Sequence, residues 1–451
     1  MSQGTFRSSR HPNRHASRRP NRHALPTRLP CAAAIALCGW LAGGCITQAV
    51  EASIDAKLEL AATALREGRL EEAVEIVADA RKRDPRHINA ARSSALIADL
   101  LWRDEVAISE QKVAIRLARP VAEREDLARL RGQLGEQLFQ AGRWGESSTP
   151  LLAGAFGGDY ERRRAFAVIA ASLPFVRHFS GPLVTEQPLL NGKAPEFVCG
   201  TSGRLRPFAI DTGTSMTTVA ATFAEELGVR QKRTAGHALD GAGRPLPIEI
   251  GMLPQFRVGN VDIGAVPVLI VTDRALHLRD LHGGPERVPR GVLGLDLIAA
   301  CRLTLDPERG SVVLELPQGL PGQDSVQCVR AEGRCLLPVV VEGKRLWFVL
   351  DTGASHSSLT TLGLQAMPRG EERAVASFRR VRTVGGGIVA VREVRDLVLR
   401  CSDARFLRVT LPVVNRGDST LFPVHGVLGI DLLSRCRVTL DRGRARLTAL
   451  R

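Results

Sequence analysis

The chain has 451 residues, of which 44% are hydrophobic and only 4% aromatic, and its formal net charge is +15. This length exceeds one ordinary hydrophobic core and predicts about three domains. Seven of the positive charges lie in residues 1–44, and the rest are spread along the chain without an aromatic-interleaved basic patch, so we expect no nucleic-acid partner.

Residues 1–44 predict an export signal peptide. They contain seven arginines and no acidic residue, and they end in an apolar run from Cys31 to Gly44 that is too short to span a membrane comfortably. The arginines are Arg7, Arg10, Arg14, Arg18, Arg19, Arg22 and Arg28. An ordinary cleaved signal and an uncleaved anchor are alternative interpretations.

The run Ala42-Gly43-Gly44-Cys45 resembles the lipobox of bacterial lipoproteins, with Leu41 one place earlier than usual. The resemblance implies lipidation of Cys45, with residues 45–50 as a tether. It also implies a location on the periplasmic side of a bacterial membrane. Because Ile46 rather than aspartate follows the cysteine, the outer membrane is favoured.

Residues 51–175 predict a helical region with an internal repeat. Gly68–Ala73 and Trp102–Ala107 are similar segments 34 residues apart, and a looser third copy begins at Gly142. Because 34 residues is the tetratricopeptide period, the region resembles a short tetratricopeptide array, which implies a concave surface for a peptide or protein partner. The alternative is a helical stack that only spaces the rest of the chain from the membrane, with Pro174–Pro182 as the exit linker.

The remaining chain contains the same motif twice. Phe208–Ser215 reads Phe-Ala-Ile-Asp-Thr-Gly-Thr-Ser, and Phe348–Ser355 reads Phe-Val-Leu-Asp-Thr-Gly-Ala-Ser. Each is followed by a Gly-Val-Leu-Gly-x-Asp-Leu segment, at Gly291–Leu297 and Gly426–Leu432. The repeat indicates an internal duplication, with one half over residues 176–320 and the other over residues 321–451. The likeness continues in the segments Cys301–Asp306 and Cys436–Asp441.

At these motifs the chain resembles the pepsin and retropepsin aspartic proteases, especially bacterial retropepsin-like proteins, over about residues 180–451. A lone Asp-Thr-Gly is weak evidence, but the doubled motif in a doubled context is specific. The resemblance implies two all-β retropepsin-like barrels that form a pseudo-dimer after the helical region. It also implies that Val292–Gly294 and Val427–Gly429 pack behind the two active-site loops.

Two neighbouring carboxylates can hydrolyse an amide without a metal, a cofactor or a covalent nucleophile. One takes a proton from water while the other, as a carboxylic acid, protonates the carbonyl oxygen. Like charges about 3 Å apart cannot both ionise, so the pair shares one proton. Asp211 and Asp351 are the predicted pair, and the sequence leaves open which is the acid. The substrate would be a peptide or protein.

Neighbouring residues are predicted to support this pair. Thr212 and Thr352 offer hydroxyls that would bond across the pseudo-twofold axis, and Gly213 and Gly353 allow tight turns and close approach of the loops. Two further aspartates follow the Val-Leu-Gly segments, where helix capping is a plainer role than chemistry. They are Asp296 and Asp431.

Glycine-rich segments between each motif and its Val-Leu-Gly segment predict hairpin tips, which are candidate substrate-covering flaps. The candidates are Gly241 and Gly243 in the first half and Gly385, Gly386 and Gly387 in the second. Plain hairpins without substrate contact are the alternative. The only tyrosine is Tyr160, so the flap tyrosine of pepsins is absent.

Six cysteines follow Cys45, an even number that permits disulfides in an oxidising compartment, and Cys328 and Cys335 are the closest pair along the chain. No cysteine or histidine cluster has zinc-ligand spacing.

Three interpretations of the whole chain remain. The first is an aspartic endopeptidase in which both halves form one cleft. The second is a catalytically inactive periplasmic binding or adaptor lipoprotein, and the third is an obligate homodimeric protease.

Overall fold

A computed structural model describes residues 42–155, 160–174, 177, 179–180, 184–189, 195–201, 203–239, 245–276, 289–383, 386–415 and 421–450. Residues 51–451 form one compact unit, and residues 1–50 form a separate one. Most of the predicted signal peptide lies outside the described residues, whereas Cys45 lies in helix α1 (Ala42–Arg66). No helix in the described part of the chain is long and apolar enough to cross a membrane.

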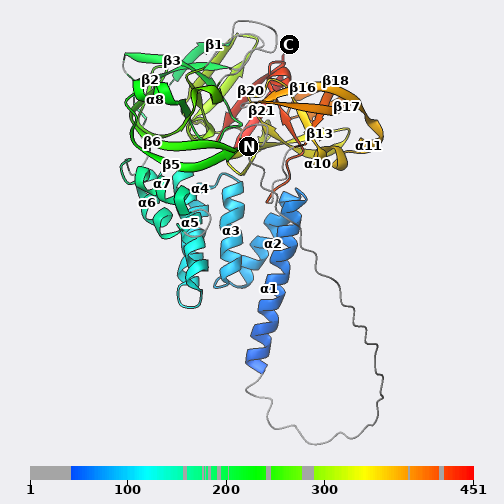
Figure 1. Ribbon diagram of the computed structural model, residues 1–451. Helices are drawn as coiled ribbons and strands as arrows, with labels where there is room; N and C mark the ends of the chain where they lie inside the picture. Colours follow the sequence, from blue (N-terminus) through cyan, green and yellow to red (C-terminus); the bar gives the residue numbers. More distant parts are fainter. Residues whose placement is uncertain are drawn as a thin grey trace, which may run out of the picture. The chain divides into compact units, whose positions relative to one another are not determined.

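The N-terminal part of the compact unit is a series of helices in which each helix from α2 onward packs against the next (Figure 1). They are α1, α2 (Leu70–Arg83), α3 (Ile88–Leu100), α4 (Asp104–Ala118), α5 (Arg124–Gln140), α6 (Trp144–Ala153) and α7 (Tyr160–Ala170). Fully buried alanines, such as Ala80 and Ala114 at equivalent repeat positions, let neighbouring helices approach closely. We call α1 to α7 the helical array.

Three turns of the helical array have the same backbone geometry. Gly68, Trp102 and Gly142 have φ angles of 73°, 61° and 75°. In each turn the next residue, an arginine, donates its backbone N–H to the carbonyl five residues back, at 2.8 to 2.9 Å. This is the Schellman ending, which satisfies carbonyls at a helix C-terminus. These three turns, at residues 68–69, 102–103 and 142–143, are the array turns.

The first β half is a closed sheet with the strand order β2-β3-β8-β4-β7-β6-β5, in which β2 also pairs with β6. Its strands are β2 (Glu196–Thr201), β3 (Arg204–Ile210), β4 (Thr218–Ala220), β5 (Arg230–Leu239), β6 (Pro245–Val258), β7 (Val261–Val271) and β8 (Gly291–Leu293). Short helices α8 (Ala221–Glu226), η2 (Asp273–Leu276) and α9 (Leu295–Ile298) follow β4, β7 and β8.

The second β half repeats this order as β13-β14-β19-β15-β18-β17-β16, preceded by β12 and closed by pairing of β13 with β17. Its strands are β12 (Val329–Ala331), β13 (Arg334–Val341), β14 (Lys344–Leu350), β15 (Ser358–Thr360), β16 (Ala374–Thr383), β17 (Gly386–Cys401), β18 (Ala404–Val414) and β19 (Gly426–Leu428). Its helices are α10 (Thr361–Ala366), α11 (Gly370–Arg373) and α12 (Ile430–Leu433). The predicted duplication is therefore a structural duplication.

A third sheet, six-stranded within the described residues, joins the two halves in the order β1-β10-β9-β20-β21-β11. Its strands are β1 (Val184–Pro188), β9 (Arg302–Asp306), β10 (Ser311–Glu315), β11 (Val326–Gln327), β20 (Cys436–Asp441) and β21 (Arg444–Ala449). At its centre the duplicated segments β9 and β20 pair antiparallel, with Thr304 opposite Thr439. The fold is therefore a helical array followed by two retropepsin-like β halves in a pseudo-dimer, which confirms the predicted fold class.

The helical array shares its apolar core with both β halves. Residues of α1 to α3, such as Leu65 and Leu70, form one cluster with Trp347 and Val349 of β14. At the other end, Trp144 of α6 belongs to the core of the first half, and α7 lies beside β5 (Figure 1). The array is thus packed against the β halves, whereas the sequence suggested helices that end in a linker.

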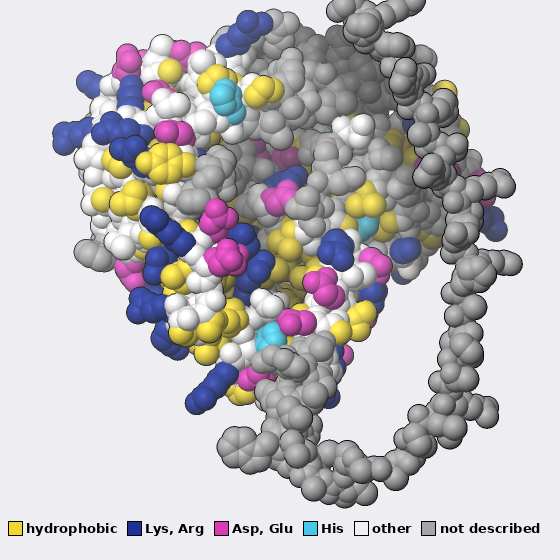
Figure 2. Space-filling model, turned by 60° about the horizontal axis from the view of Figure 1, so that its bottom comes forward, with side chains coloured by type: hydrophobic (Ala, Val, Ile, Leu, Met, Phe, Trp, Pro, Cys, Tyr) yellow, Lys and Arg dark blue, Asp and Glu magenta, His cyan; other side chains and the backbone are white. Residues whose placement is uncertain are grey.

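The surface mixes charges of both signs. Figure 2 shows basic, acidic and apolar side chains interspersed on one face, which includes part of the helical array. The six cysteines after Cys45 are free thiols in the buried core, so the structure does not contain the bond that the sequence permits between Cys328 and Cys335.

Arg330 of β12 joins the second half to the array turn at Trp102 by ion pairs and an aromatic contact. Its side chain is only 7% exposed, and its Nη2 donates to carboxylates of both Asp99 and Asp104. The guanidinium also lies 4.9 Å from the centroid of the Trp102 ring. Burial raises the pKa of Asp99 from its ordinary value, and the charge of Arg330 opposes that rise. The pairing therefore offsets the cost of burying Arg330 and of partly burying Asp99.

We expect Arg330→Met to lower the free energy of unfolding by about 1–3 kcal/mol, because two partly buried carboxylates would remain together without the cation that pairs with both. Urea unfolding followed by circular dichroism measures the change. Arg405→Ala, at an exposed arginine of β18, is the control and should alter stability by less than about 0.5 kcal/mol. An Arg330→Met protein as stable as the control would contradict this account of the junction.

Candidate active site

Both Asp-Thr-Gly motifs lie directly after a buried strand. β3 ends at Ile210 and pairs in parallel with β8, so the backbone N–H of Asp211 donates to the Leu293 carbonyl at 3.1 Å. β14 ends in the same way, and the N–H of Asp351 donates to the Leu428 carbonyl at 3.1 Å. The apolar runs before the motifs form these strands because both of their faces are covered. The Val-Leu-Gly segments lie beside the loops, where the sequence placed them.

The two motif loops are bonded to each other by reciprocal hydrogen bonds of their threonines. Thr212 Oγ1 donates to the Leu350 carbonyl at 2.7 Å and accepts from the N–H of Thr352 at 3.2 Å. Thr352 Oγ1 donates to the Ile210 carbonyl at 2.6 Å and accepts from the N–H of Thr212 at 3.1 Å. Both side chains are fully buried. Each hydroxyl therefore satisfies two backbone groups of the opposite half, and these bonds fix the position of one loop relative to the other.

The motif glycines are required by close approach to the opposite aspartate. A Cβ atom on Gly213 would lie 2.6 Å from Cγ of Asp351, and one on Gly353 would lie 2.5 Å from Cγ of Asp211. Real Cβ atoms do not come so near to a carboxyl carbon. Each loop thus lies against the carboxyl group of the other half, which brings the two predicted aspartates to one place.

The two carboxylates have different donors. Asp211 Oδ1 accepts from the N–H of Gly213 at 2.8 Å, and its Oδ2 accepts from Thr214 Oγ1 at 2.8 Å. Asp351 Oδ1 accepts from the N–H groups of Gly353 and Ala354 at 3.1 and 2.7 Å. Sequence reasoning missed the role of Thr214. The signal that could have revealed it is the difference between the two copies, since a threonine follows Asp-Thr-Gly in the first and an alanine in the second.

Asp296 and Asp431 tie the motif loops to the segments behind them. Asp296 Oδ1 accepts from both the N–H and the hydroxyl of Thr217, at 2.8 and 2.9 Å, and Asp431 makes the same pair of bonds with Ser357 at 2.8 and 2.7 Å. The helices that follow Gly294 and Gly429 have no side-chain cap. These aspartates therefore bridge two segments, which corrects their interpretation as helix caps.

His425 supports the strand that ends at Asp351. It is 6% exposed, its ring Nδ1 accepts from the backbone N–H of Trp347 at 3.0 Å, and its backbone N–H donates to the Trp347 carbonyl at 2.8 Å. Burial, with a smaller contribution from the charge of Lys344, lowers the pKa of His425 to about 4. An Nδ1 that accepts a bond must be unprotonated, so geometry and burial both favour the neutral ring.

The candidate flaps fall on hairpins. β5 pairs with β6 up to Leu239 opposite Pro245, so Gly241 and Gly243 belong to the intervening segment, outside the described residues. β16 pairs with β17, and the glycines at the start of β17 lie opposite Thr383 and Arg382. These glycines are Gly386 and Gly387, whereas Gly385 lies outside the described residues. Both hairpins exist, and substrate contact by their tips stays a prediction.

Catalysis by a cysteine nucleophile or by a metal ion has little support among the described side chains. Burial raises the pKa of the thiols of Cys301 and Cys436 to about 12, so these groups remain protonated and poorly nucleophilic. No group of three or more His, Cys, Asp and Glu side chains within the described ranges is arranged to hold a metal ion.

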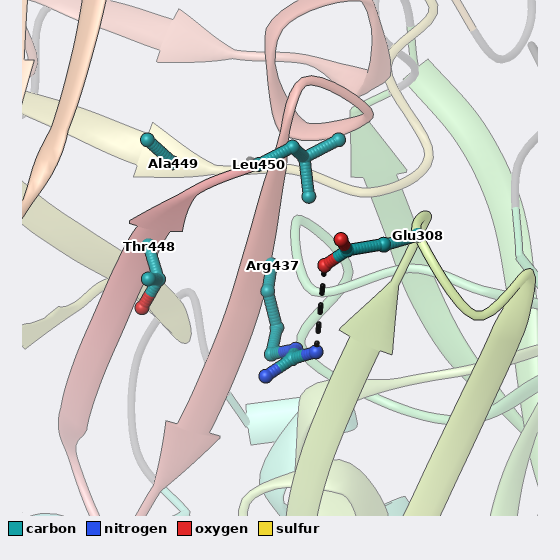
Figure 3. Close-up of a pocket in the computed structure, with 5 residues that line it drawn as sticks. All are labelled: Glu308, Arg437, Thr448, Ala449 and Leu450. Carbon is teal, nitrogen blue, oxygen red and sulfur yellow. Dashed lines mark ion pairs between the residues drawn. The ribbon is translucent and has the colours of Figure 1, made fainter.

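A pocket outside the motif loops is lined by residues of β20 and β21 and of the turn between β9 and β10 in the shared sheet (Figure 3). Its lining includes Glu308 and Arg437, whose charged groups are 3.9 Å apart, together with Thr448, Ala449 and Leu450 near the C-terminus. Arg437 also pairs with Asp306 at 2.7 Å. Because these charges already have partners and neither motif aspartate lines the pocket, it is a poor candidate for the active site.

Comparison with known proteins agrees with this geometry. The chain matches the family model for aspartyl proteases over residues 199–297 and 337–432, one match in each β half. No curated protein matches the chain.

Similar solved structures cover nearly all of their own length but only about three fifths of this chain. An aspartic proteinase from Irpex lacteus is 10% identical, with a TM-score of 0.36, and covers 59% of this chain and 97% of its own. Basic 7S globulin from soybean is 14% identical, with a TM-score of 0.34 and coverages of 59% and 95%. Conglutin gamma from lupine is 10% identical, with a TM-score of 0.35 and coverages of 61% and 95%. Likenesses this weak say nothing about activity.

The duplicated sheets and the doubled family match together define the class of the C-terminal part, which has a pepsin- and retropepsin-like fold. Both Asp-Thr-Gly motifs lie within the matched residues and occupy equivalent places in the two halves.

We expect the free energy of unfolding to fall by about 3 kcal/mol as the pH drops from 6.5 to 4, through His425 alone. The unfolded chain binds a proton at this histidine near pH 6.5, whereas the folded protein does so only near pH 4. The unfolded state therefore binds more protons in this window, and stability decreases as the pH falls. Denaturant unfolding at pH 7, 5.5 and 4 measures the effect.

The matched variant is His425→Asn, because an asparagine oxygen can accept the Trp347 N–H without titrating. It should lose less stability than the wild type over the same pH range. Equal pH dependence in the two proteins would show that His425 does not titrate as described.

Proposed function

We propose that the protein is an aspartic endopeptidase whose active site is composed of Asp211 and Asp351. The observation that carries the proposal is the close packing of each motif glycine against the carboxyl group of the opposite half, with the threonine bonds that hold it. This arrangement supports a carboxyl pair that is preorganised before substrate binds. The aspartyl protease family match in both halves supports the same reaction class.

The reaction would use the pair as a proton-sharing unit. A water molecule between the carboxyl groups loses a proton to the ionised one and attacks the peptide carbonyl, while the protonated one donates its proton to the carbonyl oxygen. The tetrahedral intermediate then breaks at the C–N bond, and the leaving amine takes a proton from the pair. The two carboxyl groups have different surroundings, because Thr214 donates to Oδ2 of Asp211, whereas the corresponding residue of the other motif, Ala354, has no hydroxyl.

A site formed within one chain is favoured over a homodimeric site. The hydrogen bonds between Thr212 and Thr352 join two halves of the same molecule, and β9 pairs with β20 in the shared sheet. Intact aspartates in both halves also favour an enzyme over an inactive binding lipoprotein.

Asp211→Asn or Asp351→Asn alone should lower kcat/KM for peptide cleavage by at least about 10³-fold, because each amide removes one of the two titrating groups. The assay is cleavage of a diverse peptide library from acidic to neutral pH, analysed by mass spectrometry. Asp403→Asn, which alters an exposed carboxylate near Arg446, is the control and should cleave like the wild type. Substantial cleavage by either active-site variant would refute the shared pair.

We also propose that the protein is exported and attached to the periplasmic side of a bacterial membrane, with the outer membrane favoured, through lipid on Cys45. The lipobox-like sequence supports this location. A protein partner bound to the exposed surface of the helical array remains a further proposal, supported by the 34-residue repeat.

Cys45→Ala should move the protein from the membrane fraction to the soluble periplasmic fraction, because the acyl chains supply the anchor. Fractionation of cells that express the full chain, followed by immunoblotting, measures the distribution. Cys199→Ala, at a buried core cysteine, is the control and should leave it unchanged. An equal membrane share for Cys45→Ala and the wild type would contradict lipidation.

A further inference from the structure

The array turns are points at which the helices contact the second β half or the segment that leads to the first. At the first turn, Trp347 Nε1 donates to the Gly68 carbonyl at 2.9 Å. At the second, Trp102 lies against Arg330. At the third, the backbone N–H of Arg177 donates to the Gly142 carbonyl at 2.9 Å. The first two array turns therefore touch the second half, and the last turn bonds to the segment between α7 and β1.

In the second half, this contact leads directly to the motif loop. Trp347 is in β14, four residues before Asp351, and its backbone is bonded on both sides to His425. His425 in turn precedes β19, which pairs with β14 behind the loop. The array thus packs against the strand that delivers one of the two aspartates.

In the first half, the connection runs through Arg177, which lies between α7 and β1. Its guanidinium carbon is 5.2 Å from the centroid of the Trp144 ring, directly after the third array turn. Its Nε and Nη1 atoms are buried and make no hydrogen bond to the described residues. A buried guanidinium with unused donors needs a negative charge nearby.

Burial lowers the pKa of Arg177, and Asp296 is the largest influence that opposes this, ahead of Cys301 and Asp104. Burial raises the pKa of Asp296 to about 6, and Arg177 is the largest influence that opposes the rise. Its Oδ2 atom is buried and has no hydrogen-bond partner among the described residues, while its Oδ1 holds both polar groups of Thr217. One oxygen of Asp296 is therefore committed to the motif loop, and the other, like Nε and Nη1 of Arg177, is buried without a hydrogen bond to a described residue.

The segment that contains Asp296 fixes the loop of Asp211 at several further points. The N–H groups of Leu295 and Asp296 donate to the carbonyls of Thr214 and Ser215, at 2.8 and 3.1 Å. Thr214 is also the residue whose hydroxyl bonds to Asp211. A displacement of residues 295–296 would therefore move Thr214, whose hydroxyl donates to the carboxyl group of Asp211.

We propose that the helical array is a positioning element of the active site, and that Arg177 and Asp296 are the positioning residues through which it holds the Asp211 loop. Neither residue touches substrate in this account. The array then has a role in catalysis besides any recruitment of partners. The proposal rests on the proposed endopeptidase activity for its kinetic consequence, but its structural consequence is independent of cleavage.

The test is a double-mutant cycle in the full-length protein with Arg177→Gln, Asp296→Asn and the double variant. Each single change leaves one buried charge without its partner, whereas the double change removes both. We expect kcat to be about tenfold lower in each single variant, with KM nearly unchanged. In the double variant, kcat should return most of the way to the wild-type value. Arg164→Gln removes an exposed arginine of α7 that stacks on Tyr160, and it should leave kcat unchanged.

Amide hydrogen exchange of a peptide that covers residues 208–217 provides a readout without substrate. Exchange should be faster in both single variants than in the wild type and return toward the wild-type rate in the double variant. Unchanged exchange in the single variants, or losses of kcat that simply multiply in the double variant, would overturn the proposal. If the wild type cleaves no peptide, the endopeptidase assignment fails, and the hydrogen-exchange result alone tests whether the helical array positions the Asp211 loop.

Discussion

The reciprocal bonds of Thr212 and Thr352 are the interaction on which the rest of the site depends. Each hydroxyl is fully buried and accepts an N–H from the opposite loop while it donates to a carbonyl of the opposite strand. A buried polar group without a partner is costly, so neither loop can separate without leaving several groups unsatisfied. This constraint brings Gly213 against the carboxyl group of Asp351 and Gly353 against that of Asp211.

The second constraint is the way in which the helical array is attached. Its core is continuous with the outer side of β14 at one end and with the first half at the other. Arg330 adds a buried ion pair to two carboxylates at the middle turn. The helical array therefore packs against both halves, in addition to the shared sheet that joins them directly. Stability and catalytic geometry would then be linked, because the same contacts serve both.

Much of this architecture was accessible from the sequence, for a physical reason. The motif copies repeat apolar strand, aspartate and glycine in one order, and such short-range patterns predict the strands and the loops. The place of the Val-Leu-Gly segments behind the loops followed from the resemblance to pepsins and retropepsins. The roles of Asp296, His425 and Arg177 were not predictable, because each depends on a partner far away along the chain. The six free thiols illustrate the same limit, since an even count in sequence says nothing about which sulfur atoms meet. The packing of the array on both halves was missed because Pro174–Pro182 reads as a linker.

The central claim is that both aspartates of one molecule form one active site. The most direct measurement mixes purified Asp211→Asn and Asp351→Asn proteins under conditions that allow subunit exchange, and compares peptide cleavage with that of the wild type. A site within one chain predicts that the wild type cleaves and that the mixture remains inactive. Cleavage restored in the mixture would show that halves of different chains combine into one site. A wild type that cleaves no peptide at any pH would contradict the proposed endopeptidase activity.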